Sequence, residues 1–253
     1  MTWVHALLIG LAGVAAGAIN TVVGSGTLIT FPTLIAFGYA AVTANISNDI
    51  GLVAGGFSGT WGYRRELRGS RRLLLRLGPA SLLGSVAGAV LLIKLPASAF
   101  ATIVPVLIGI GLVLVVVGPW LQRRALAAHS DLDTVPRRVV LTLGVFGAGI
   151  YGGYFGAAQG VILTGLMSAL LPHDIQRITA IKNLLATIVN TVSAITFLLI
   201  AFDRINWWVA LLIAIGSFLG GLLGARVGRR LPQWGLRAVI VVIGVAAIVH
   251  QLV

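Results

Sequence analysis

A single lysine inside an apolar run is the residue best suited to bind an anion. Lys182 lies about one helical turn inside that run, and a charge deep in a bilayer costs roughly 2.5 to 3.5 kcal/mol on insertion scales. Its charge must therefore be compensated. A bound anion would do so, with Asn183 and Ser47 supplying neutral hydrogen bonds. The alternatives are an ion pair with Asp49 or Asp174, or a side chain that reaches the nearby membrane interface.

A glycine-rich break interrupts the apolar sequence before a short segment near the N-terminus. The break spans residues 20–27 (NTVVGSGT) and contains Asn20, Gly24, Ser25 and Gly26. The helix that follows would begin with unpaired backbone N–H groups directed at the break, and such an N-terminus favours an anion. Glycine also lets the backbone approach a ligand closely. The alternative is that these small residues only allow helices to pack closely.

A second break of the same kind occurs in the second half of the chain. It spans residues 152–160 (GGYFGAAQG), again before an unusually short apolar segment, and contains Gly156 and Gln159. Broken segments at matching positions of two repeats are the sequence pointer to a substrate site near the membrane midplane. Aromatic residues at this break would either wall a pocket or anchor the helix at the interface; they are Tyr151, Tyr154 and Phe155.

Four polar residues lie within five positions at the start of the third apolar segment: Asn45, Ser47, Asn48 and Asp49. Such a cluster is unusual in a lipid-facing helix, so we expect these side chains to face protein or water. Asp49 is either a carboxylate that couples transport to protons or a partner in an ion pair. The sequence leaves both interpretations open.

The composition places these residues in a membrane protein. Of the 253 residues, 58% are hydrophobic and 9% are charged, with a mean hydropathy of +1.04, whereas a soluble domain carries about 25% charged residues. Apolar runs of about 17 to 25 residues recur along the chain, which is the length that crosses a hydrocarbon core. The sequence therefore predicts an all-α, polytopic transmembrane helix bundle.

Several classes of function are excluded by what the sequence contains. The net charge of +12 lies in short clusters between apolar runs, which is typical of cytoplasmic loops and not of a nucleic-acid surface. Cysteine is absent, the four histidines are scattered, and no P-loop, HExxH or nucleophile-elbow motif occurs. We expect no enzyme activity, no cofactor, no metal site and no nucleic-acid partner.

The chain contains an internal repeat. Residues 84–96 align with residues 220–232, and residues 42–47 with residues 178–183, both at an offset of 136. Further upstream, residues 17–26 align with residues 149–158 at an offset of 132, which matches Gly24 to Gly156. We expect a first transmembrane repeat over residues 1–121, a cytoplasmic linker over 122–136 and a second transmembrane repeat over 137–253.

Each repeat contains five apolar segments, of which the second is short. They span about residues 3–19, 27–41, 44–63, 73–95 and 100–121, then 139–155, 161–171, 178–202, 207–226 and 236–253. Five crossings per half place all three arginine clusters in the cytoplasm, whereas four crossings place the cluster at Arg226, Arg229 and Arg230 outside. We predict two inverted five-segment repeats with both termini outside. The second segment of each repeat either crosses the bilayer or dips in and returns.

Five motifs together carry a family resemblance: residues 17–32 (GAINTVVGSGTLITFP), 43–48 (TANISN), 152–160 (GGYFGAAQG), 178–184 (ITAIKNL) and 224–232 (GARVGRRLP). In combination they resemble the TauE/SafE family of sulfite exporters over nearly the whole chain. The resemblance implies a bacterial inner-membrane permease for sulfite, organosulfonates or related small organic anions, driven by ion gradients. It implies binding roles for Asn20, Gly24, Ser25, Gly26, Asn48, Gly156, Gln159, Lys182 and Asn183.

We therefore predict a permease that moves a small sulfur-containing or organic anion by alternating access, with the two breaks and Lys182 binding the anion. One alternative is a passive anion channel with the same glycine-rich lining. Another is a membrane assembly factor without transport. The sequence leaves open the exact anion, the direction of transport, the coupling ion and whether the protein is a homodimer.

Overall fold

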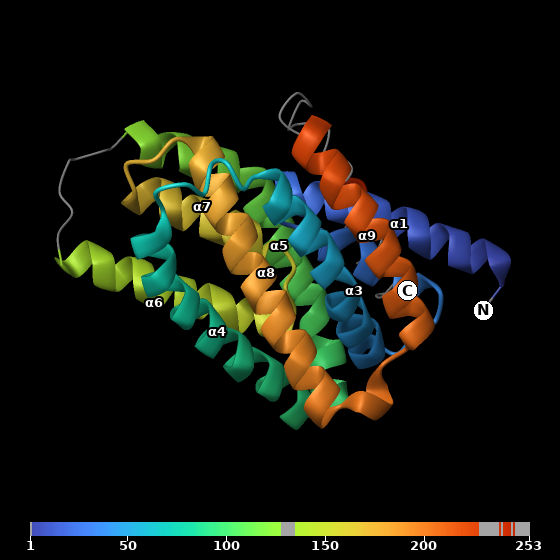
Figure 1. Cartoon of the computed structure of the whole chain (residues 1–253). Helices are drawn as coiled ribbons and strands as arrows, with labels where there is room; N and C mark the ends of the chain where they lie inside the picture. Colours follow the sequence, from blue (N-terminus) through green and yellow to red (C-terminus); the bar gives the residue numbers. More distant parts are fainter. Residues whose placement is uncertain (1, 128–134, 228–237, 239, 244, 246–253) are drawn as a thin grey trace.

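The computed structural model describes residues 2–127 and 135–227, together with residues 238, 240–243 and 245. This part of the chain consists of helices joined by turns and loops and contains no strand (Figure 1). The elements are α1 (Trp3–Val22), α2 (Thr27–Ala36), α3 (Ala41–Gly62), α4 (Arg71–Lys94), α5 (Ala97–Ala127), α6 (Val135–Tyr154), α7 (Gln159–Leu170), α8 (Ile175–Ile200), the short 3-10 helix η1 (Phe202–Arg204) and α9 (Trp207–Val227). Nine of the predicted segments correspond to these α-helices; of the tenth, only residues 238, 240–243 and 245 are described. Helices α5 and α6 extend into the predicted linker from both sides, and its residues 128–134 lie outside the described residues.

Five of these helices are long and apolar enough to cross a membrane: α1, α4, α5, α8 and α9. Helix α3 is also long, but its polar cluster lowers its hydropathy, and α6 begins with Arg137 and Arg138. Large apolar side chains such as Leu83 and Leu199 are exposed on the outside of the bundle, which is the surface that lipid covers. The protein is a multi-pass membrane protein.

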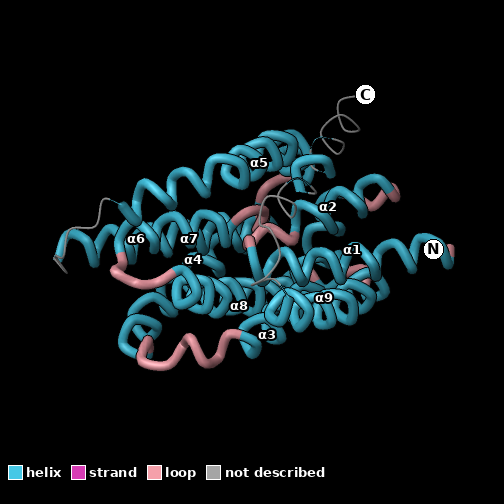
Figure 2. The backbone as a smooth tube through the Cα atoms, turned by 90° about the horizontal axis from the view of Figure 1, so that it is seen from above, coloured by secondary structure: helices cyan, strands magenta, loops and turns pink. Residues whose placement is uncertain are grey.

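Each short helix folds back against the helix before it. The ring of His5, near the start of α1, stacks on Phe37 at the end of α2, with their centroids 4.4 Å apart. In the second half, Arg137 near the start of α6 donates to the carbonyl of Ala169 near the end of α7 over 3.1 Å. Both pairs are therefore helical hairpins, as the tube in Figure 2 shows for α1 and α2. A ten-residue helix is about 15 Å long, half of a hydrocarbon core, so the length and the hairpin geometry favour the dip-and-return alternative.

The two halves run in opposite directions through the bundle. Helices α3 and α8 hold equivalent places in the two repeats, and they pack antiparallel: Asp49 contacts Ser193, whereas Thr60, further along α3, contacts Thr187. The first half contains one hairpin and three further long helices, which is an odd number of passages. The predicted inversion therefore follows from a different count than five full crossings.

The first helix of each half packs through glycines on the fourth helix of the other half: α1 on α9, and α6 on α4. A Cβ on Gly17 of α1 would lie 2.2 Å from the carbonyl oxygen of Ser217 in α9, and one on Gly88 of α4 would lie 2.1 Å from that of Ile150 in α6. Such contacts let backbones touch, as is common between membrane helices. The two interfaces are reciprocal, and they hold the hairpins in place.

Replacing Gly88 with alanine should lower the melting temperature of the detergent-solubilised protein by several degrees, because the new Cβ would overlap the α6 backbone, and overpacking costs about 1 to 3 kcal/mol. Tryptophan fluorescence during heating measures it. The matched control is Gly147→Ala in α6, where a Cβ would meet nothing within 4 Å. Equal melting temperatures for the two variants would contradict the close packing of α4 on α6.

Candidate functional site

The two glycine-rich breaks meet each other inside the bundle. The carbonyl of Gly24 accepts a hydrogen bond of 3.0 Å from the backbone N–H of Gly160, at the start of α7. Reciprocally, Gly156 lies against Thr27, the first residue of α2. Gly24 and Gly156 have φ angles of 93° and 77°, a region that glycine adopts without the strain other residues incur. The predicted breaks therefore form one junction, visible as loops in the middle of the bundle in Figure 2.

Lys182 reaches this junction from α8. Its side chain is 1% exposed, and its Nζ donates to the carbonyls of Asn20 and Thr21 over 3.0 and 3.1 Å. These carbonyls belong to the last turn of α1, where a helix carries partial negative charge. A Cβ on Gly160 would lie 2.9 Å from the lysine Cδ. The lysine thus lies between the end of α1 and the start of α7.

Among the described residues, Lys182 neither forms an ion pair nor reaches the membrane interface. No carboxylate contacts its ammonium group in the described part of the chain, so neither Asp49 nor Asp174 is its partner. Its burial also shows that it does not reach the interface. Asp174 caps the start of α8 instead, accepting from the backbone N–H of Arg177. Main-chain carbonyls could not be foreseen as partners, because sequence spacing does not reveal where a helix from the other half ends.

Three potential donors in the two breaks, or next to Lys182 in sequence, have no hydrogen-bond partner in the described part of the chain. They are the Ser25 Oγ in the first break, the Gln159 Nε2 in the second and the Asn183 Nδ2 next to Lys182. All three side chains are buried. Buried polar groups are nearly always paired, so three unpaired donors in the segments that form one junction point to a ligand with acceptor atoms.

Asn48 fixes the short helix of the first hairpin. Its amide group bonds the hydroxyls of both Thr27 and Thr30 in α2, and its Nδ2 lies 3.4 Å from the Thr27 Oγ1. Thr30 was not identified from the sequence. Its position three residues after Thr27, on the same helix face, could have indicated that both hydroxyls bond one partner. Asn48 thus positions the start of α2 and with it Gly26, the residue that precedes this helix.

The second hairpin is held in a similar way but without a charge. The Asn45 Nδ2 donates to the carbonyl of Tyr154 at the end of α6 over 3.1 Å, as Lys182 does at the end of α1. The neutral amide of Asn45 therefore binds the end of α6 as the charged ammonium group of Lys182 binds the end of α1. The positive charge of the junction is on one side only.

Two predicted site residues lie away from Lys182. The Ser47 Oγ accepts from the backbone N–H of Asn206, before α9, over 2.8 Å. Asp49 accepts from the Ser193 hydroxyl over 2.6 Å. Neither contacts the breaks, because the four polar residues of α3 point to different sides of that helix.

Aromatic rings pack behind the second break. Phe155 meets Phe31 of α2 at 5.2 Å between ring centroids, and Tyr154 meets Phe100 of α5 at 5.6 Å. Tyr154 and Phe155 are buried, so they support the interior of the junction and are not interfacial anchors. The tryptophans at segment ends are exposed as expected for a belt at the interface: Trp61, Trp120, Trp207 and Trp208.

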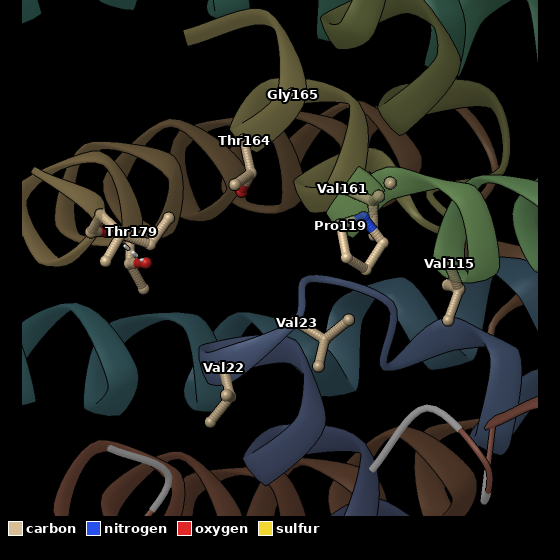
Figure 3. A pocket seen from close by; sticks show the side chains of 10 residues that line it. Val22, Val23, Val115, Pro119, Val161, Thr164, Gly165 and Thr179 are labelled. Atoms are coloured by element: carbon tan, nitrogen blue, oxygen red, sulfur yellow. Dashed lines mark hydrogen bonds between the residues drawn. The ribbon is translucent and has the colours of Figure 1, made fainter. Parts of the chain in front are cut away.

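A pocket lies among four helices, about one turn of α8 away from Lys182. It encloses about 430 Å³, space open to the outside included. Its walls come from the end of α1, from α5, from α7 and from the start of α8, and Figure 3 shows Thr164 and Thr179 facing a space bounded by valines. The wall residue Thr179 lies one turn before Lys182 in α8. The lining residues are Val22, Val23, Val115, Gly118, Pro119, Val161, Thr164, Gly165, Ile175 and Thr179.

Comparisons with known proteins cover the whole site. Residues 9–250 match the family described as Sulfite exporter TauE/SafE. The chain is 27% identical over 245 residues to the probable membrane transporter protein YfcA of Escherichia coli strain K12, covering 95% of this chain and 88% of that protein. It is 24% identical to the probable membrane transporter protein ORF9 of Sinorhizobium sp, over 96% and 90% of the two chains. A probable membrane transporter protein of Haemophilus influenzae is 27% identical over 91% and 88%. No solved structure matches.

Proposed function

Because the chain belongs to the TauE/SafE sulfite exporter family, and is a membrane transporter, we propose that it carries a small sulfur-containing or organic anion by alternating access. The anion binds where the two hairpins meet. Sulfite and organosulfonates are the class we favour, since their oxygens accept hydrogen bonds from several directions at once.

The observation that carries this proposal is a buried cation at the junction of two breaks that also contain unpaired polar groups. An ammonium group has three N–H donors, and two of those on Lys182 are engaged by the end of α1. The third N–H and the positive charge remain for a ligand. Ser25, Gln159 and Asn183 supply the neutral donors that oxyanion oxygens need. A cationic or purely apolar substrate would satisfy none of these groups.

The inverted halves supply the movement. Because α3 and α8 run antiparallel and each half holds one hairpin, rocking one half against the other opens the junction alternately to the two sides. The pocket between α5, α7 and the start of α8 is the route from the cytoplasmic side. The Gly160 to Gly24 hydrogen bond joins the hairpin tips of the two halves, so it is the contact that this movement changes.

Counterflow in proteoliposomes tests the proposal. Vesicles loaded with unlabelled sulfite, an alkyl sulfonate, sulfate or a short carboxylate are diluted into labelled substrate, and at least one of the first two should drive transient accumulation of label. A passive channel would give equilibration without overshoot. An assembly factor would give neither flux nor any anion-dependent rise in melting temperature. Either result would contradict a carrier.

A further inference from the structure

Asp49 is a half-buried carboxylate that the anion site does not use. It lies on α3 of the first half, and its Oδ2 is 2.6 Å from the Oγ of Ser193, on α8 of the second half. Ser193 is fully buried. This contact therefore joins α3 and α8, one helix from each half, which must move relative to each other when the halves rock.

The Ser193 hydroxyl has three acceptors within reach and only one hydrogen. Besides Asp49, it lies 2.9 Å from the carbonyl oxygen of Val189 and 3.2 Å from that of Asn190, both about one turn earlier in α8. A hydroxyl donates one hydrogen bond and accepts others. When Asp49 is ionised, Ser193 must donate to the carboxylate. When Asp49 is protonated, the carboxyl donates to the Ser193 Oγ, and the hydroxyl turns to Val189. Both protonation states thus have a complete hydrogen-bond arrangement.

No charged group pairs with Asp49 in the described part of the chain. The elements packed against α3 are α1, α2, α5, α8, α9 and η1. Their charged or titratable residues with described side chains are His5 in α1, Arg124 in α5, Arg177 and Lys182 in α8, Arg226 in α9, and Asp203 and Arg204 in η1, with none in α2. A carboxylate held by one hydroxyl suits a proton; a metal cation would need several more oxygen ligands.

We propose that Asp49, together with Ser193, is the proton site of this protein, and that one proton accompanies each monovalent anion. This inference rests on the proposed anion transport. A proton from water binds the carboxylate on one side and returns to water on the other. With Lys182 positive and Asp49 negative, the empty carrier has no net charge in its core, and binding one anion and one proton preserves that balance. Crossing the membrane then avoids the cost of an unbalanced buried charge.

The position of Asp49 connects this proton to the anion site. Its neighbour Asn48 holds Thr27 and Thr30 of α2, and its partner Ser193 is on α8, which carries Lys182. A change in the hydrogen bond between Asp49 and Ser193 therefore acts on the two helices that position the first break and the cation.

The test measures proton and anion movement together. Proteoliposomes containing a pH-sensitive dye receive a pulse of the anion found by counterflow, with potassium and valinomycin clamping the membrane potential. For the wild-type protein we expect about one proton per monovalent anion, and an inside-alkaline pH gradient should drive uptake. In Asp49→Asn, pH-driven accumulation should fall at least tenfold while labelled exchange stays measurable. Asp203→Asn, which changes an exposed carboxylate in η1, should behave as wild type.

Four outcomes are informative. Counterflow without proton movement in the wild-type protein, or unchanged coupling in Asp49→Asn, would refute the proton site and leave the anion carrier intact. Absence of counterflow for every anion would refute the carrier itself. Should Asp49→Asn not fold, Ser193→Ala gives the answer: loss of the donor to the ionised carboxylate should move the pH of half-maximal transport upward by about half a unit or more. An unchanged pH midpoint would overturn the proposal.

Discussion

Lys182→Gln is expected to lower anion counterflow at least about 30-fold, since removing one member of a buried charge pair costs about 2 kcal/mol or more. Glutamine keeps a hydrogen-bond donor for the carbonyls of Asn20 and Thr21 but carries no charge to attract the anion. Initial rates of labelled exchange in proteoliposomes, at substrate concentrations below saturation, measure the effect.

The protein's other lysine provides the control. Lys94 is exposed at the end of α4, so Lys94→Gln should leave exchange unchanged. Melting temperatures separate binding from capping: if Lys182 only stabilises the end of α1, Lys182→Gln lowers the melting temperature but keeps the upward shift produced by the anion. Loss of that shift together with exchange supports a binding role, and retention of both would refute it.

The fold was largely accessible from the sequence because membranes impose strong rules. Apolar runs predict helices, since only helices satisfy every backbone group within one segment in lipid, and the segment boundaries agree to within a few residues for most helices. The hairpins were less accessible. Nothing in residues 27–41 distinguishes a segment that crosses from one that returns, because the return is fixed by tertiary contacts such as that of His5 with Phe37.

The site was accessible where a residue breaks a local rule. A lysine in an apolar run and a Gly-Ser-Gly break both do so, and the structure brings them to one junction. Ser47 aligns with Asn183 in the repeat, but its side chain binds the backbone N–H of Asn206 and not the junction. A repeat alignment reports equivalent backbone positions; it does not report the direction of a side chain across an inverted interface. Ser193 was missed for a related reason: one serine in an apolar helix is ordinary until Asp49 is found opposite it.

Gly24→Ala should have the largest effect of any change to an uncharged residue, abolishing exchange and strongly lowering the melting temperature. Two penalties combine there. A φ of 93° is unfavourable for a residue with a Cβ, at about 1 to 2 kcal/mol. The new Cβ would also lie 2.4 Å from the Cα of Gly160, so the hairpin tips must separate and the hydrogen bond between them is lost.

Two further glycines separate these penalties. Gly38 has a φ of 81° but open space around it, so Gly38→Ala introduces the backbone strain alone. Gly160 has no positive φ, yet its Cβ would lie 2.4 Å from the Cα of Gly24, so Gly160→Ala introduces the contact alone. If the meeting of the breaks forms the anion site, Gly160→Ala should lose exchange as Gly24→Ala does, while Gly38→Ala transports at the wild-type rate with a modestly lower melting temperature. Exchange that instead followed melting temperature across all three variants would mean that the junction matters only for stability.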